Sequence, residues 1–507
     1  MESALIPFLP YLLTSLLLLI LSLNWFIRKR VTHSKAELPP GPWTLPFFGS
    51  LHHLATAGLP HHALHNLAVA HGPVMLLRLG EIDFVVVSSR EAAKEVMKTH
   101  DAIFANRPAM IAPSVLLYGC KSIAWSSGPY WRQMRRICAT ELFSTKLVKS
   151  FYSIRQAEIN SLLKAFTLGS NKSPVNLSAM TAELSSNISI HAAFAGTYKN
   201  KQVFLETLGE ALECFSGFGL SDLFPSIRLL RLITTRRLTK LRSKLDLVIE
   251  EVIQDHLIKQ QQRMKGGDDQ ELEYDLVDVL LNLKERDDFE EPITMDHIKA
   301  VILDIFIAGT ETSSTIITWA MAELIKHPQI MERVQTEIRH AASENNMLDE
   351  NSLSYLKLVI KETLRMHPPV PLLAPRQCMK SCQILGYTIP SEARVVVNAW
   401  ALDRNPEYWD DPEKFKPERF ETSCIDFKGQ NFEFLPFGAG RRMCPGLEFG
   451  MAMVQESLAS LLLHFDWKLP EAMKPEDMDM TETFGIAAAK KEPLYLIPTL
   501  CVPLPEF

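Results

Sequence analysis

The chain has 507 residues, a net charge of −6, and a composition of 47% hydrophobic and 22% charged residues. The negative charge and the lack of a basic stripe exclude a nucleic-acid-binding protein, and the ordinary composition excludes a collagen-like or largely disordered chain. The eight cysteines show no zinc-finger spacing, and their sparseness predicts a reducing compartment without structural disulfides.

The N-terminal stretch predicts a membrane anchor. Residues 3–27 carry no charge and are rich in leucine, so as a helix they can cross a hydrocarbon core of about 30 Å. The basic run Arg28–Arg30 that follows places the rest of the chain on the cytoplasmic side. The alternative is a cleaved signal peptide, which would have a basic start and a small-residue cleavage site, whereas this chain starts with Glu2. Residues 28–42 then form a basic and proline-rich hinge.

Beyond the hinge the chain shows mostly helical patterns with a few short strands. Val74–Leu79 and Phe84–Ser88 have strand character, and Ser89–His100 has the cap and the periodicity of a helix. Later short strands are expected within 383–389 and 394–398. We therefore predict a mainly α fold with small β-sheets (α+β), built as one large domain over residues 43–507.

A helix is predicted over Tyr130–Cys138. Trp131 and Arg135 are four residues apart in it and therefore lie on one face. An indole N–H and a guanidinium on one face could hold the same carboxylate. The alternative is a cation–π pair at the surface.

A second, mostly apolar helix is predicted over Ile298–Leu324. It contains Gly309, which costs about 1 kcal/mol relative to alanine inside a helix, so we expect the helix to open locally there and accept a small molecule or water. Ala308 and Thr312 lie four residues apart on one face, and Glu311 is an acid beside them. The alternative is a kinked buried helix with satisfied polar groups.

Three charged residues predict a structural cluster. Glu362 and Arg365 are three residues apart on a helix, and Arg419 follows in the segment Pro417–Phe420. An exposed pair of this kind contributes only about 0–1 kcal/mol. A buried carboxylate between two arginines must be fully paired, so we assign these residues a structural role.

The stretch Phe434–Gly446 places one cysteine, Cys444, in a glycine-rich and proline-rich loop directly before an apolar helix. Its glycines allow a close approach to a planar ligand. A thiolate there, with Arg442 two residues upstream for an acidic substituent, suits a haem iron. The alternative is a buried free cysteine in a turn.

The pattern Phe437-x-x-Gly440-x-Arg442-x-Cys444-x-Gly446 resembles the haem-binding signature of the cytochrome P450 family. The family's oxygen-binding motif is similar to residues 308–313, its Trp-x-x-x-Arg motif to residues 131–135, and its Glu-x-x-Arg and Pro-Glu-Arg-Phe pair to residues 362–365 and 417–420. The proline-rich hinge and several other segments resemble plant A-type microsomal members, in particular enzymes of terpenoid and other specialised metabolism.

This resemblance implies the cytochrome P450 fold, a single large domain behind an N-terminal transmembrane helix, with haem b as cofactor. It implies that Cys444 is the axial ligand of the iron. It also implies that Thr312 hydrogen-bonds the iron-bound peroxo group and that Glu311 relays protons to its distal oxygen. Glu362, Arg365 and Arg419 would lock the core beneath the haem. Arg376 matches a propionate-binding arginine, and a surface arginine is the alternative. The implied cofactor-binding residues are Trp131, Arg135, Arg376, Phe437, Arg442, Cys444 and Gly446.

The resemblance also implies a monooxygenase that inserts one atom of O2 into a small molecule and releases the other as water. Substrate contacts carried over by position are mostly apolar, which predicts an apolar substrate, although each could be plain core: Ile305, Ala308, Val370, Leu372 and Ile486. The alternative function is a haem protein that binds a ligand without turnover, as a sensor or store.

The electron supply must come from elsewhere, because the sequence contains neither a nucleotide-binding fingerprint nor a flavin domain. The resemblance implies a separate NADPH–cytochrome P450 reductase as partner, with O2 and NADPH as co-substrates. It implies a single-pass protein of the endoplasmic reticulum membrane with its catalytic domain on the cytoplasmic side. Basic side chains at Arg132, Arg136 and Arg441 could meet an acidic redox partner, or could simply be solvated.

Overall fold

The computed structural model describes residues 15, 37–55, 58–168, 173–194, 201–266, 275–286, 289–345, 353–471, 473–483 and 485–504. The expected anchor over residues 3–27 lies outside the described residues except for Ser15, and so does the hinge up to residue 36. The described chain is mainly helical with small sheets, as predicted.

The helices and helical turns, in chain order, are α2 Leu51–Ala55, α3 Pro60–His71, α4 Arg90–Lys94, η2 Glu95–Thr99, α5 Ile111–Leu116, α6 Gly128–Ile137, η3 Cys138–Leu142, α7 Thr145–Ser150, α8 Tyr152–Leu168, α9 Leu177–Phe194, α10 Lys201–Leu212, η4 Glu213–Phe215, α11 Leu220–Leu223, α12 Arg228–Gly266, α13 Leu276–Lys284, α14 Met295–Lys326, α15 Pro328–Asn345, α16 Ser354–Met366, α17 Ala399–Leu402, η5 Pro417–Phe420, η6 Gly440–Arg442, α18 Leu447–His464 and η7 Pro475–Asp477. The strands are β1 Val74–Leu79, β2 Ile82–Val87, β3 Val175–Asn176, β4 Arg376–Gln377, β5 Cys382–Ile384, β6 Tyr387–Ile389, β7 Arg394–Val397, β8 Phe465–Lys468 and β9 Tyr495–Leu500.

The main sheet has the order β1-β2-β7-β4. Strands β1 and β2 form an antiparallel hairpin with Val74 opposite Val87, and β7 pairs with β2 in parallel. Because side chains alternate along a strand, Val85 packs into the apolar cluster on one face and Val86 into the cluster on the other. The expected strands therefore form, with β2 beginning two residues earlier than predicted.

The hairpin turn at Gly80 shows why this position is glycine. Its φ is +61°, and a Cβ there would lie 2.5 Å from the carbonyl oxygen of Leu223. A side chain would therefore be strained and would collide with the backbone of α11.

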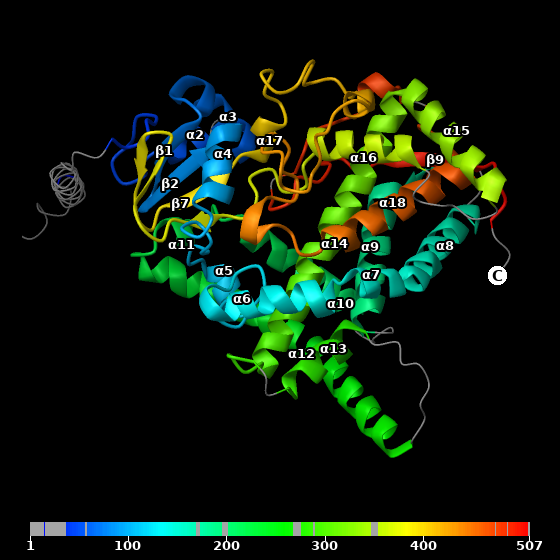
Figure 1. Ribbon diagram of the computed structural model, residues 1–507, viewed down its shortest axis with the longest axis horizontal. Coiled ribbons are helices and arrows are strands. Elements are labelled where there is room, and N and C mark those ends of the chain that lie inside the picture. Colours follow the sequence, from blue (N-terminus) through cyan, green and yellow to red (C-terminus); the bar gives the residue numbers. More distant parts are fainter. Residues whose placement is uncertain are drawn as a thin grey trace, which may run out of the picture.

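Helix α14 runs through the centre of the helical part, where it contacts α9, α18 and α16 (Figure 1). The sheet lies on the left of the view, next to α3 and α4, whereas α8 and α15 lie on the right (Figure 1). Among the described residues, α14 is also the one helix long and apolar enough to cross a membrane, but about two thirds of its most apolar stretch is buried in the core. The loop that carries Cys444 leads directly into α18, so α18 and α14 hold the two halves of the predicted site.

Candidate active site

Cys444 lies between η6 and the first turn of α18 and is half-buried. Its backbone N–H donates to the carbonyl of Phe437 over 3.0 Å, and the Gly446 amide donates to its sulfur. Burial raises the pKa of the Cys444 thiol, and the Gly446 amide and the charge of Arg135 only partly oppose this effect. A thiolate at this position therefore needs a positive centre in contact with it, which a haem iron provides.

The loop before Cys444 is folded back on the body of the protein. Gly438 and Gly440 have φ values of +68° and +69°, in the left-handed region. A Cβ at Gly440 would lie 2.0 Å from the carbonyl oxygen of Met97. Phe437 is half-buried and packs against Phe427, with ring centroids 5.5 Å apart.

Three arginines lie close enough at this loop to interact through their charges, and Arg442 belongs to the loop itself. Arg376 and Arg442 were predicted from the sequence. Arg107, Arg376 and Arg442 repel one another: burial and the charges of the other two lower the pKa of Arg107 well below its usual value. Burial, followed by the charges of Arg376 and Arg135, lowers the pKa of Arg442 to about 9. An excess of positive charge on one buried and two half-buried arginines fits an anionic group, such as the two propionates of haem b.

The arginines are held mainly by backbone carbonyls rather than by acids. Arg107 donates to Ala374 and Pro375 over 2.8 and 2.7 Å. Arg442 donates to Ala105 over 2.7 Å. Arg376 is buried, which excludes the alternative of a surface arginine. Arg107 was not predicted, because its only local signal is an Arg-Pro step in an apolar loop.

Trp131 and Arg135 both lie on α6, as predicted, but each of them interacts with a different part of the cysteine loop. The guanidinium of Arg442 lies 3.9 Å from the ring centroid of Trp131, and this tryptophan is buried. Arg135 acts on Cys444 and Cys138 through its charge. The cation that stacks on Trp131 is therefore Arg442 of the cysteine loop, which links α6 to this loop.

The predicted local opening of the central helix is wrong for this structure. Helix α14 is continuous through Gly309. The Thr312 hydroxyl donates to the Ala308 carbonyl over 2.6 Å, and Ser185 of α9 donates to the Gly309 carbonyl over 2.8 Å. A Cβ at Gly309 would lie 3.0 Å from Ser189 Oγ. The glycine thus permits the close packing of α9, and hydroxyl groups satisfy the carbonyls without breaking the helix.

The same stretch presents reactive groups at an accessible surface. Ala308 is exposed, and its neighbours Ile307 and residues 309–312 are half-buried, whereas the helix is buried up to Phe306 and again from Ser313. Burial raises the pKa of Glu311, and no described residue forms a hydrogen bond or ion pair with its carboxyl. Glu311 can therefore hold or release a proton beside Thr312.

Asp304, one turn before Ala308, links this helix to the arginines. Burial raises the pKa of Asp304 to about 6. The hydrogen bonds that its carboxylate accepts, among them one of 2.8 Å from the Ala124 N–H, lower the pKa and only partly oppose this effect. The Ala124 carbonyl in turn accepts from Arg107 Nε over 2.8 Å. Asp304 was not predicted as a site residue, because an acid inside an apolar helix gives no local indication of its partner.

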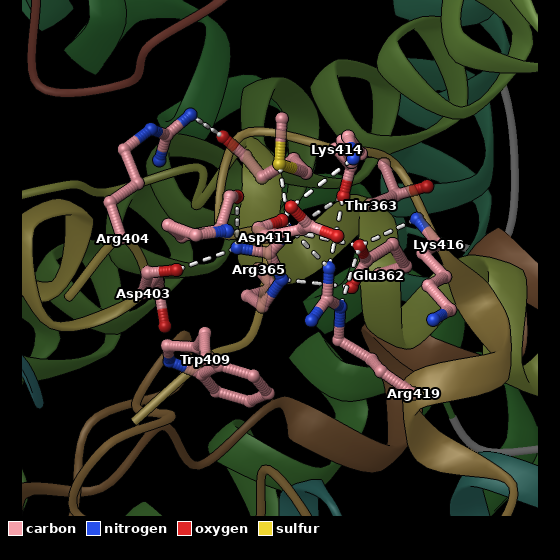
Figure 2. Close-up of polar contacts among 12 residues, drawn as sticks. Glu362, Thr363, Arg365, Asp403, Arg404, Trp409, Asp411, Lys414, Lys416 and Arg419 are labelled. Atoms are coloured by element: carbon pink, nitrogen blue, oxygen red, sulfur yellow. Dashed lines mark hydrogen bonds and ion pairs between the residues drawn. The ribbon is translucent and has the colours of Figure 1, made fainter. Parts of the chain in front are cut away.

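Figure 2 shows the predicted structural cluster. Arg365 donates to both oxygens of Glu362, over 2.8 and 2.9 Å, and Arg419 Nε donates to Glu362 Oε1 over 3.0 Å. Glu362 and Arg365 are fully buried. Arg365 also donates to the carbonyls of Asp403 and Pro412, over 2.7 and 2.8 Å. The cluster thus fastens α16 to the chain that leads to the cysteine loop.

The predicted substrate residues fall into two groups. Val370, Leu372 and Ile486 line one pocket of about 40 Å³ together with Phe215 and Phe218. The other two, Ile305 and Ala308, do not line this pocket and lie on α14.

Known proteins provide an independent comparison. The family model for Cytochrome P450 matches residues 39–497. The chain is 48% identical to desmethyl-deoxy-podophyllotoxin synthase of Sinopodophyllum hexandrum, covering 97% of both chains. It is 46% identical to premnaspirodiene oxygenase of Hyoscyamus muticus, covering 95% of this chain and 97% of the relative. A solved zebra fish cytochrome P450 structure with progesterone has a TM-score of 0.73 at 27% identity, covering 87% of this chain and 99% of the other.

Proposed function

This chain belongs to the cytochrome P450 family and is a monooxygenase, and we propose that its substrate is an apolar plant terpenoid or a related specialised metabolite. Its relatives include premnaspirodiene oxygenase and 5-epiaristolochene 1,3-dihydroxylase of Nicotiana tabacum, the latter 46% identical with 94% of this chain covered. The side chains of Val370, Leu372 and Ile486 are apolar, as such a substrate requires, and the pocket of about 40 Å³ that they line would have to widen to admit it.

Haem b would be held from two sides. Cys444 provides the thiolate, and Arg107, Arg376 and Arg442 provide the positive charge for the propionates. When bound, haem supplies the oxygen activation, because a thiolate ligand donates electron density to the iron and favours cleavage of the O–O bond. The Gly446 amide stabilises the negative charge on the sulfur.

The proton supply is assigned to Glu311 and Thr312. Glu311 is half-buried with a raised pKa, which keeps a proton available next to the helix. The Thr312 hydroxyl now donates to Ala308, and by rotating about its Cα–Cβ bond it can donate toward the exposed face instead. Together they would deliver protons at Thr312 Oγ1, on the accessible side of the helix.

Electrons would come from NADPH through a separate NADPH–cytochrome P450 reductase. Arg132 and Arg136 on α6 and Arg441 in the cysteine loop are exposed, and we infer that they contact an acidic partner. Residues 3–27 would anchor the chain in the endoplasmic reticulum membrane, residues 28–42 would form the hinge, and residues 43–507 the cytoplasmic catalytic domain. Ligand binding without turnover is the weaker alternative, because the relatives are named as oxygenases, hydroxylases and synthases.

The observation that carries this proposal is the sequence identity of 48% and 46% to a synthase and an oxygenase of plants, over nearly the full length of the chain. To test it, membranes that contain this chain and a plant reductase receive NADPH under ¹⁸O2, with a panel of sesquiterpene hydrocarbons, diterpene phenols and lignans. Mass spectrometry should show a product that gains one labelled oxygen atom from a member of this panel. A second panel of fatty acids and amino acids is assayed in parallel, and a labelled product from that panel alone would contradict the substrate proposal while leaving the monooxygenase assignment intact.

A further inference from the structure

Asp101 is a buried acid outside the predicted site, and it joins two parts of that site. It directly follows η2 and His100 in the chain. Its Oδ1 accepts from Arg376 Nη1 over 3.0 Å, and its Oδ2 accepts from the backbone N–H of Arg441 over 2.7 Å. The same carboxylate thus contacts a proposed propionate-binding arginine and the loop that carries the cysteine.

Arg376 completes a closed ring of hydrogen bonds. Its second guanidinium nitrogen, Nη2, donates to the carbonyl of Ala439 over 3.0 Å. Ala439 and Arg441 flank Gly440, so Arg376 and Asp101 hold the loop on either side of this glycine. Burial lowers the pKa of Arg376, and the Asp101 charge opposes that effect. The acid therefore fixes the position of this guanidinium and supports its charge.

The loop packs closely against its neighbours at these contacts. A Cβ at Gly440 would lie 2.0 Å from the Met97 carbonyl oxygen and 2.8 Å from Asp101 Oδ2. The loop therefore rests directly on η2 and on the carboxylate, and Cys444 follows four residues later. The side chain of Asp101 is nearly inaccessible to solvent, at 9% exposure, so water does not readily replace a lost contact.

We propose that Asp101 is a positioning residue, which sets the position of Cys444 and of Arg376 toward the haem. This inference rests on the proposed haem–thiolate site. Removal of its charge should weaken haem binding, because Arg376 and the cysteine loop lose their common partner. It should also make reduction of the iron easier, because a buried negative charge near the site opposes the added electron.

The test uses the full-length holoprotein in membranes or detergent, with the variant Asp101→Asn. The matched control is Asp83→Asn, which removes an Asp–Arg pair with Arg78 at the partly exposed hairpin. Three quantities are measured for each protein: the carbon monoxide difference spectrum, the ferric/ferrous reduction potential, and the rate of haem transfer to an excess of a haem-scavenging globin. Asp101→Asn should lose haem about tenfold faster than the wild type, since it gives up a charge-assisted hydrogen bond in a buried site.

The reduction potential separates positioning from mere structural support. Asp101→Asn should shift the potential to a more positive value, Asp101→Glu should return it toward the wild-type value, and Asp83→Asn should leave it unchanged. A wild-type potential and haem-loss rate in Asp101→Asn would overturn the inference. Asp101→Glu keeps the charge, but its longer side chain must shift the loop at Gly440, so it should still lose haem faster than the wild type. If Asp101→Asn does not fold, a wild-type haem-loss rate in Asp101→Glu would therefore overturn the inference. Absence of a thiolate-type spectrum in the wild type would instead refute the proposed site itself.

Discussion

The hydroxyl of Thr312 donates a hydrogen bond of 2.6 Å to the carbonyl oxygen of Ala308, one turn earlier on α14. The helix stays continuous through Gly309 beside this bond. The bond also places the hydroxyl oxygen next to the exposed methyl of Ala308, where the proposed proton delivery takes place. The helix therefore does not need to open in advance, because a side-chain rotation is sufficient to redirect the donor.

Replacement of Thr312 should uncouple oxygen consumption from product formation. A positioned proton donor contributes about 10²–10⁴-fold to a reaction, so product per NADPH in Thr312→Ala should fall by at least about tenfold, with more hydrogen peroxide. Haem content should stay unchanged. Thr312→Ser keeps the hydroxyl and serves as the control. Equal product per NADPH in the alanine variant and the wild type would disprove the proton-delivery role.

The stability of the protein should depend on the ionisation of Asp304. Its pKa rises from 3.8 to about 6 on folding, so the stabilisation that it provides is complete below pH 3.8 and is lost as the pH rises through 6. The total loss is about 3 kcal/mol, and roughly half of it falls between about pH 5 and about pH 7.5.

Asp304→Asn cannot ionise and should lack this component. Denaturant unfolding of both proteins should show that the variant gains stability relative to the wild type as the pH rises from about 5 to about 7.5. A stability difference that is the same at both pH values would show that the Asp304 carboxyl titrates normally.

The Glu362 cluster should dominate the stability of the region before the cysteine loop. Glu362→Gln leaves Arg365 and Arg419 without a counter-charge in a fully buried site, which should cost about 3–5 kcal/mol. Glu418→Gln is the matched control, because Glu418 pairs with Arg333 at a partly exposed position and should cost about 1 kcal/mol or less. Thermal unfolding of the holoproteins measures both, and comparable losses would refute the structural role.

The basic surface on α6 should govern the encounter with the reductase. The double variant Arg132→Glu and Arg136→Glu should slow NADPH-driven haem reduction about tenfold at low salt, and high salt should narrow this difference. Turnover supported by added peroxide, which bypasses the reductase, should stay unchanged. Lys240→Glu with Lys244→Glu, an exposed pair of the same spacing on α12, is the control. An equal effect of both pairs would assign the change to net charge alone.

Local sequence patterns predicted the elements that depend on residues close together in the chain. The strand hairpin follows from alternating apolar residues around Gly80, and the cysteine loop follows from its glycines and from the helix that begins after it. The cluster of Glu362, Arg365 and Arg419 was also predicted, because two motifs each supplied part of it.

The missed residues depend on contacts between distant parts of the chain. Asp101 meets Arg441 across 340 positions, Asp304 meets Ala124 across 180, and Arg107 meets Ala374 across 267. An acid or arginine in a loop gives no local indication of such a partner. The predicted opening of α14 failed for the same reason, since Ser185 comes from another helix.

The central claim is that Cys444 provides a thiolate ligand to a haem iron. Its most direct test is the carbon monoxide difference spectrum of reduced membranes that contain either the wild-type chain or Cys444→Ala at equal protein level. We predict a thiolate-type spectrum for the wild type and its complete loss in the variant. A thiolate-type spectrum that persists in Cys444→Ala would contradict the assignment of this ligand.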